Sequence, residues 1–148
     1  MTTLPFDTRN IHWNTLEGIP HLAYHICAVD EQRRIVDLLF KFDANSKIVL
    51  HQHKAHYITL VLQGELRIYT ASGELKEVRP VGSYVATDPG GSPHTEGGGD
   101  QDVIAFFSNR DVDGLVYEIL DENHNIIATF GIPEFKALLD AQNMLPAS

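Results

Sequence analysis

The stretch that decides the fold reads His51-Gln52-His53-Lys54-Ala55-His56-Tyr57, continues through the apolar residues 58–62 and stops at Gln63-Gly64. In an extended segment, side chains two residues apart point to the same face, so His51 and His53 project together. A neutral imidazole is a common nitrogen ligand for zinc, iron, nickel or copper. A His-x-His pair is too short to identify a site alone. We therefore interpret the pair as two ligands of a metal site whose third ligand comes from elsewhere in the chain.

Length and composition restrict the protein class. The 148 residues carry 11 Lys and Arg against 20 Asp and Glu, for a net charge of −9. This length fits one domain over residues 1–148, and the acidic balance disfavours nucleic acid and anionic membranes as partners. No apolar run approaches membrane length, and residues 1–10 lack a signal-peptide pattern. The single cysteine, Cys27, alternates with apolar neighbours and is predicted to lie in the core. With no intramolecular disulfide, we expect a cytoplasmic protein.

Short strand-like runs fill most of the chain and predict an all-β fold. They cover residues 22–29, 33–42, 65–70, 74–78, 83–87, 103–107, 114–120 and 126–130. Many short strands joined by Gly, Pro, Asn and Asp turns are typical of a sandwich or barrel. Residues 1–20 are predicted as an N-terminal arm in which residues 11–13 form a short strand. Pro133 suits a first helical turn, so residues 133–143 are predicted as one C-terminal helix.

His94 is the candidate third ligand. It follows the loop 88–93, in which two prolines restrict the backbone and would hold the next side chain in place. Three further residues have two interpretations each. His56 is a fourth ligand or proton shuttle, or else a loop histidine facing water. Tyr57 points into the site or fills the barrel. Glu96 shares the inward face with His94 and orients an imidazole or acts as a base, or else it lies in solvent because residues 97–99 are all glycine.

Together these features resemble the two sequence motifs of the cupin superfamily. The matching residues are His51, His53 and Gly64 in the first motif and Gly82, Pro89, Gly90 and His94 in the second. The motifs cover residues 46–96. The resemblance implies a double-stranded β-helix, which is a jelly-roll-like barrel, and a metal bound by the three histidines. It also implies a homodimer formed by exchange of edge strands, with the N-terminal arm as the segment that crosses over.

One residue departs from the cupin pattern. Tyr57 stands where the family has a glutamate ligand, and residues 51–63 contain no Asp or Glu. This variant resembles a smaller group of cupins, the C–C-cleaving dioxygenases that act on acetylacetone and on 2,4'-dihydroxyacetophenone. Three neutral ligands would leave the metal charge uncompensated in a buried site, which favours an anionic ligand. We therefore expect a chelating substrate, such as the enolate of a small diketone or hydroxyketone, with O2 as co-substrate.

Three functions remain open from the sequence. The first is a dioxygenase with Fe(II), although Zn or Ni would also suit the ligands. The second is a non-enzymatic zinc-binding sensor or interaction module, like the cupin part of a ChrR-type anti-sigma factor. The sequence shows neither the helical domain nor the cysteines expected of such a regulator. The third is a metal-dependent isomerase or lyase, which keeps the fold and uses no O2.

Overall fold

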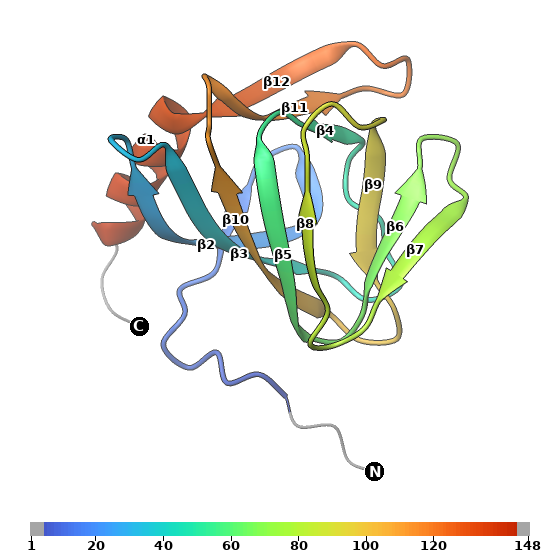
Figure 1. Ribbon diagram of the computed structural model, residues 1–148. Coiled ribbons are helices and arrows are strands. Elements are labelled where there is room, and N and C mark those ends of the chain that lie inside the picture. The colour runs from blue at the N-terminus through green and yellow to red at the C-terminus, as the bar shows by residue number, and fades with distance from the viewer. Residues whose placement is uncertain (1–4, 145–148) are drawn as a thin grey trace.

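The computed structural model describes residues 5–144. Two six-stranded antiparallel sheets enclose the core, and one helix follows them in the chain (Figure 1). The first sheet contains β1 (Asn14–Leu16), β2 (Ile19–Asp30), β3 (Ile35–Phe42), β10 (Val103–Arg110), β5 (His56–Gln63) and β8 (Tyr84–Thr87), in that order. The second contains β12 (Ile126–Gly131), β11 (Leu115–Leu120), β4 (His51–His53), β9 (His94–Gly98), β6 (Leu66–Thr70) and β7 (Leu75–Arg79). The predicted all-β, jelly-roll-like class is confirmed.

The strand order brings distant parts of the sequence together. In the second sheet, β4 pairs with β11 on one side and with β9 on the other. His51 lies directly opposite His94 in this register. The position at which two candidate ligands meet is therefore fixed by the main-chain pairing of the sheet.

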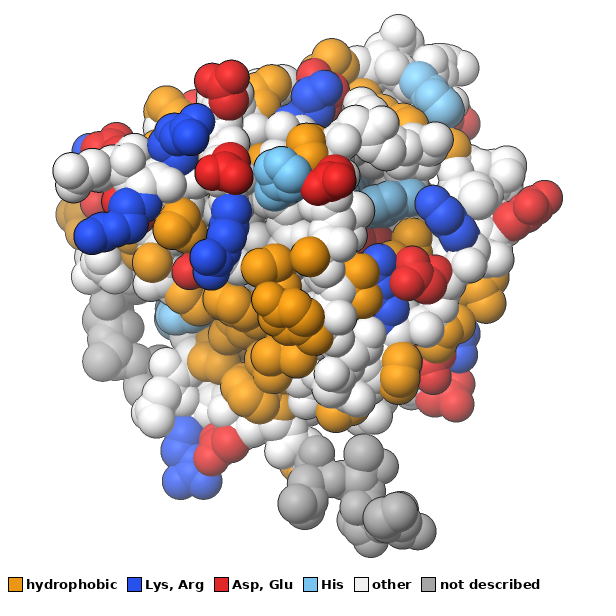
Figure 2. All heavy atoms as spheres, viewed as in Figure 1, with side chains coloured by type: hydrophobic (Ala, Val, Ile, Leu, Met, Phe, Trp, Pro, Cys, Tyr) orange, Lys and Arg blue, Asp and Glu red, His pale blue; other side chains and the backbone are white. Residues whose placement is uncertain are grey.

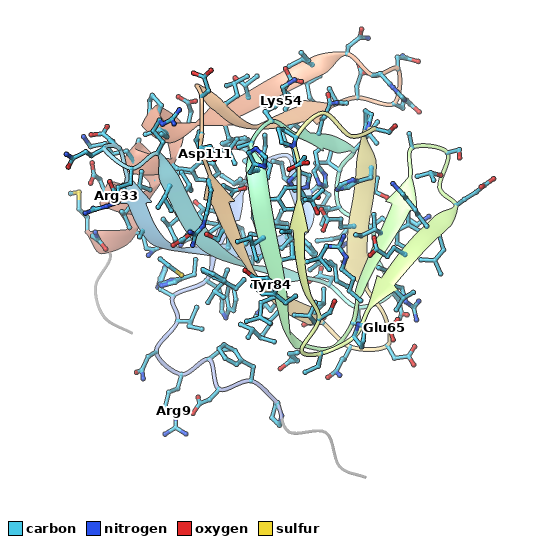
Figure 3. All side chains as sticks on the ribbon, viewed as in Figure 1. Arg9, Arg33, Lys54, Glu65, Tyr84 and Asp111 are labelled. Atoms are coloured by element: carbon cyan, nitrogen blue, oxygen red, sulfur yellow. The ribbon has the colours of Figure 1, made fainter. Side chains whose placement is uncertain are left out.

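The core lies between the two sheets, where side chains fill the interior (Figure 3). Strand β3 shows the cause, because Val36, Leu38, Phe40 and Phe42 alternate along it and are buried. Alternate residues of a strand share one face, so this spacing places all four against the opposite sheet. Burial of large apolar side chains of this kind contributes roughly 1.5–3 kcal/mol each.

The outer face of the first sheet also carries apolar residues. Leu60 of β5 is the cross-strand neighbour of Phe106 on one side and of Tyr84 on the other. The Tyr84 side is open, with 65% of this residue exposed. Figure 2 shows hydrophobic side chains gathered on this face, with Lys, Arg, Asp and Glu side chains around them.

The N-terminal arm differs in part from the prediction. The expected strand at residues 11–13 is wrong, because the strand is β1 (Asn14–Leu16), which pairs with β2. The difference arises at Gly18, whose φ of 82° allows a tight turn that places Leu16 opposite Ile19. Residues 1–4 of the predicted arm lie outside the described residues.

The C-terminal helix α1 (Ile132–Asn143) agrees with the predicted range to within one residue. At its start, the Gly131 backbone N–H donates to the Glu134 carboxylate at 2.8 Å. Near its end, the Gln142 side chain accepts from the Ile26 N–H at 2.9 Å and donates to the Ile26 carbonyl at 3.0 Å. The helix is therefore attached to β2 at its C-terminal end. No helix in the described part of the chain has the length and apolar character needed to cross a membrane.

Two glycines let β9 run past its neighbours. The strand continues through Gly97 and ends at Gly98, so the glycine cluster does not terminate it at Glu96. A Cβ atom at Gly97 would lie 1.8 Å from the Ser46 carbonyl oxygen. Only a residue without a side chain permits this close approach. The prolonged strand keeps Glu96 inside the sheet.

Candidate metal centre

Four side chains from two neighbouring strands form the candidate metal centre. His51 and His53 come from β4, whereas His94 and Glu96 come from β9. One potential ligand atom from each residue lies within 4.8 Å of the others. Each pair is spaced two residues apart, so both members point to the same side of the sheet. The cluster is a direct result of strand alternation and of the β4–β9 pairing.

The three imidazoles converge on one carboxylate oxygen. Glu96 Oε1 lies 2.9 Å from His51 Nε2, 3.0 Å from His94 Nε2 and 3.4 Å from His53 Nε2. The Nε2 atoms of His53 and His94 are 3.2 Å apart. Glu96 itself is only 2% exposed. Three nitrogens and one oxygen therefore face a common, buried point.

The hydrogen bonds around the cluster fit a bound cation. His51 Nδ1 lies 2.9 Å from the Val49 carbonyl oxygen, which can only accept, so Nδ1 carries the proton. In the tautomer with its single proton on Nδ1, His51 presents a bare Nε2 beside Glu96 Oε1, and both atoms can act as metal ligands. A divalent metal ion among these atoms would bind both, and imidazole nitrogens with a carboxylate suit zinc, iron or nickel. The residues present therefore fit a metal.

The charges of the buried side chains in the cluster also fit a bound cation. Burial lowers the pKa of His53 to about 3, so its imidazole is neutral at physiological pH. Burial raises the pKa of Glu96, but its contacts with the imidazoles of His51, His53 and His94 together hold that pKa well below its ordinary value. An ionised carboxylate buried here is costly unless a positive charge accompanies it. A bound cation would supply that charge.

The cluster borders two spaces of different character. One is a cavity of about 50 Å³ that touches His51, His53 and Glu96. Its other walls are apolar and include Phe40, Phe42, Phe107, Tyr117, Phe135 and Leu138. The second is a pocket of about 160 Å³ that touches His53 and His94, and its lining includes Lys76, Glu77, Arg79, Thr87 and Ser92. The cavity would thus suit the apolar groups of a small molecule bound at the cluster, and the pocket would suit its polar groups.

The structure brings the three predicted histidine ligands together, but it adds a negatively charged side chain that was not expected among the ligands. His51, His53 and His94 lie in one cluster, as their spacing indicated. The expectation of a site without a carboxylate is wrong, because Glu96 occupies the cluster. The carboxylate comes from the second motif, two residues after His94, and not from the first motif. The interpretation of Glu96 as a solvent-exposed strand end is wrong for the same reason.

The two remaining candidates lie differently. His56 is exposed, and its Nδ1 lies 2.8 Å from the Asp88 carboxylate, so it stands outside the cluster. Tyr57 is buried, and its ring stacks on that of His53 with 3.8 Å between centroids. Burial raises the pKa of Tyr57, so the phenol is neutral.

Some residues near the site carry no signal in the sequence. Arg79 is buried beside the polar pocket, where its Nη1 donates to Thr59 Oγ1 at 2.8 Å and its Nε donates to Glu77 at 3.0 Å. The Tyr117 hydroxyl bonds to the Asn109 side chain at 3.4 Å. Alternation along the strands gives the face of each residue but not its partner in the opposite sheet.

No protein-family model matches this chain, and no curated protein sequence does. Its structure, however, resembles solved proteins. An RmlC-like cupin from Ralstonia eutropha is 20% identical with a TM-score of 0.72, and the match covers 100% of this chain and 94% of that protein. An acetylacetone dioxygenase from Acinetobacter johnsonii is 14% identical with a TM-score of 0.68, covering 95% and 92%.

A third match is a complex of SigE with the anti-sigma factor ChrR from Rhodobacter sphaeroides. It is 21% identical with a TM-score of 0.55 and covers 70% of this chain and 50% of that one. These likenesses concern the fold, because the identities are low. They show that the chain has the cupin fold, in which its cluster of three histidines and Glu96 lies on β4 and β9.

Proposed function

We propose that the protein is a metal-dependent dioxygenase that uses Fe(II) and O2 to cleave a C–C bond in a small diketone or hydroxyketone. The observation that carries this proposal is the buried cluster of three histidines and Glu96 beside an apolar cavity. The fold likeness to an acetylacetone dioxygenase supports it by analogy. Fe(II) is favoured because sites with histidine and carboxylate ligands and open positions are typical of non-haem iron oxygenases.

The charge of the cluster selects the class of substrate. When bound, the metal supplies a Lewis acid and a template for the two substrates. Glu96 contributes one negative charge against the two positive charges of the ion, so one positive charge remains. A monoanionic chelate, such as the enolate of a diketone, would neutralise it. A monoanionic ligand is therefore the best match to the charge of the site, whereas three neutral histidines alone would have left two positive charges.

The chain's own residues would hold and shield this substrate. The cavity beside His51 and His53 is apolar, so it suits the carbon groups of a ketone and excludes water. We assign Glu96 the role of a fourth ligand, because its Oε1 lies within 3.4 Å of all three Nε2 atoms and would meet the same ion. An oxygen bound to the metal is not free to act as a general base, so we assign Glu96 no separate role of that kind.

A zinc-binding sensor or interaction module is the second candidate. It is favoured by the count of donors, because three histidines and one glutamate can close a tetrahedral zinc site without an open position. The fold likeness to the ChrR complex is compatible with it. A metal-dependent isomerase or lyase would use the same residues without O2.

One experiment separates these functions. We expect protein loaded anaerobically with Fe(II) to bind acetylacetone with a visible charge-transfer band, and to consume O2 with loss of that band when air is admitted. A His94→Ala variant serves as the control and should show neither signal. Tight zinc binding without turnover would support the sensor instead, and turnover without O2 consumption would support the isomerase or lyase.

The homodimer and the cytoplasmic location are also proposals, and they rest on the sequence resemblance and composition. Light scattering of the purified protein tests the first. A mass of one chain across the micromolar range would reject the homodimer.

A further inference from the structure

We propose that Tyr57 is a positioning residue whose ring holds the imidazole of His53 in its metal-binding orientation. The proposal rests on the metal-binding part of the proposed function and is independent of the dioxygenase chemistry. It assigns the work to the aromatic face of Tyr57, and the phenolic hydroxyl has no part in it.

The two rings are in close parallel contact. Their centroids are 3.8 Å apart, and their planes differ by 9°. Both residues are deeply buried, with 5% of Tyr57 and 6% of His53 exposed. The contact arises because the chain passes from β4 to β5 within two residues, Lys54 and Ala55, so that the start of β5 folds against the end of β4. The pair thus joins the two sheets at the site.

His53 lacks the hydrogen bond that ordinarily fixes a metal-binding histidine. A ligating imidazole usually donates its second ring N–H to a carbonyl, carboxylate or water, which sets its orientation. His51 follows this rule, because its Nδ1 donates to the Val49 carbonyl. The Nδ1 of His53 is buried without a hydrogen-bond partner among the described residues. Contacts with the neighbouring aromatic rings are then the ones that restrict rotation of the His53 ring.

The neighbouring rings supply that restriction, and Tyr57 is the nearest. Tyr117 meets the His53 ring edge-on at 5.3 Å, and Phe107 lies parallel to it at 6.4 Å. Of these three rings, only that of Tyr57 lies at stacking distance. Tyr57 also lines the polar pocket with Thr87 and Arg79. Tyr57 thus contacts His53 through the face of its ring and also forms part of the wall of the polar pocket.

The test compares a variant that keeps the ring with one that removes it. Tyr57→Phe retains the stacked face, whereas Tyr57→Leu retains only apolar bulk. Loss of an outer-shell partner typically weakens metal binding by about 10-fold to 100-fold. We expect Co(II) alone, measured by competition with a chromophoric chelator, to bind Tyr57→Leu about 10-fold more weakly than wild type, and Tyr57→Phe within about twofold. Leu38→Ala, which truncates a fully buried side chain that borders neither the cavity nor the polar pocket, serves as the control for general loosening of the core.

A second readout uses the metal-free protein. A ring at 3.8 Å shifts the NMR signals of the His53 ring protons upfield, and this shift should persist in Tyr57→Phe and vanish in Tyr57→Leu. Unchanged Co(II) affinity in a folded Tyr57→Leu variant would overturn the proposal. So would equal losses in Tyr57→Phe and Tyr57→Leu, or an equal loss in Leu38→Ala. If Tyr57→Leu does not fold, the absence of an upfield shift in wild type and Tyr57→Phe would overturn it. Failure of wild type to bind any metal would reject the proposed function, while the NMR shift would still test the ring contact.

Discussion

Replacement of Glu96 by glutamine tests whether the fourth member of the cluster contributes to metal binding. The change keeps the volume and one acceptor oxygen but removes a negative charge that lies 2.9–3.4 Å from three imidazole nitrogens. Because Glu96 is 2% exposed, water screens this charge little. Loss of an outer-shell partner weakens metal binding by about 10-fold to 100-fold, or ~1.4–2.7 kcal/mol, and we expect loss of a charged ligand to cost at least as much. We expect Glu96→Gln to fall near the upper end of this range.

The assay is competition for Zn(II) between the protein and a chromophoric chelator. Glu118→Gln is the matched control, because Glu118 lies on β11 opposite Gln52 and its side chain approaches Lys54 at 3.6 Å, outside the cluster. The control should bind Zn(II) within about twofold of wild type. An unchanged affinity in Glu96→Gln would refute the role given to this carboxylate. An equal loss in both variants would show that net charge alone matters.

Three further predictions concern stability. In the metal-free protein, His53 becomes protonated below about pH 6.5 in the unfolded chain but only near pH 3 in the folded state, because burial lowers its pKa to about 3. The unfolding free energy should therefore fall as the pH drops through this window, by up to about 1.4 kcal/mol per pH unit. Denaturant titrations at several pH values should show a weaker dependence of the unfolding free energy on pH in His53→Gln than in wild type. Gln142→Ala removes two hydrogen bonds to the Ile26 backbone and should lower the unfolding free energy by about 1–3 kcal/mol, measured the same way. Gly97→Ala places a Cβ against a backbone carbonyl and should abolish both cooperative unfolding and Zn(II) binding, whereas Gly91→Ala, with open space around it, should change neither.

The sequence predicted the strands and the three histidines well because both follow from local alternation. The His51 and His53 spacing needs only an extended strand, and the loop before His94 needs only its prolines. The helix at the C-terminal end was marked by Pro133 and the apolar spacing after it. These features depend on near neighbours in the chain.

The positions of Glu96, Cys27 and the Tyr57 ring depended on contacts between separate segments of the chain, and local patterns do not encode such contacts. Glu96 could not be placed with certainty because Gly97 normally signals a strand end, and only the close approach of the Ser46 carbonyl explains why the strand continues. Cys27 was predicted to lie in the core but is exposed. The β2–β3 register shifts between Ile26 and Ala28, so the alternation of buried and exposed side chains is interrupted there, and Cys27 and Ala28 are both exposed. The direction of the Tyr57 ring likewise depended on how β5 folds against β4.

In our interpretation, one divalent metal ion is held by His51, His53, His94 and Glu96. The most direct measurement is the metal content of protein purified without chelators, determined by inductively coupled plasma mass spectrometry. Wild type is compared with a His51→Ala/His94→Ala double variant. We expect about one ion per chain in wild type, with iron as the main metal, and close to none in the double variant. Metal-free wild-type protein that stays metal-free after incubation with Fe(II) or Zn(II), or a double variant that keeps its ion, would contradict it.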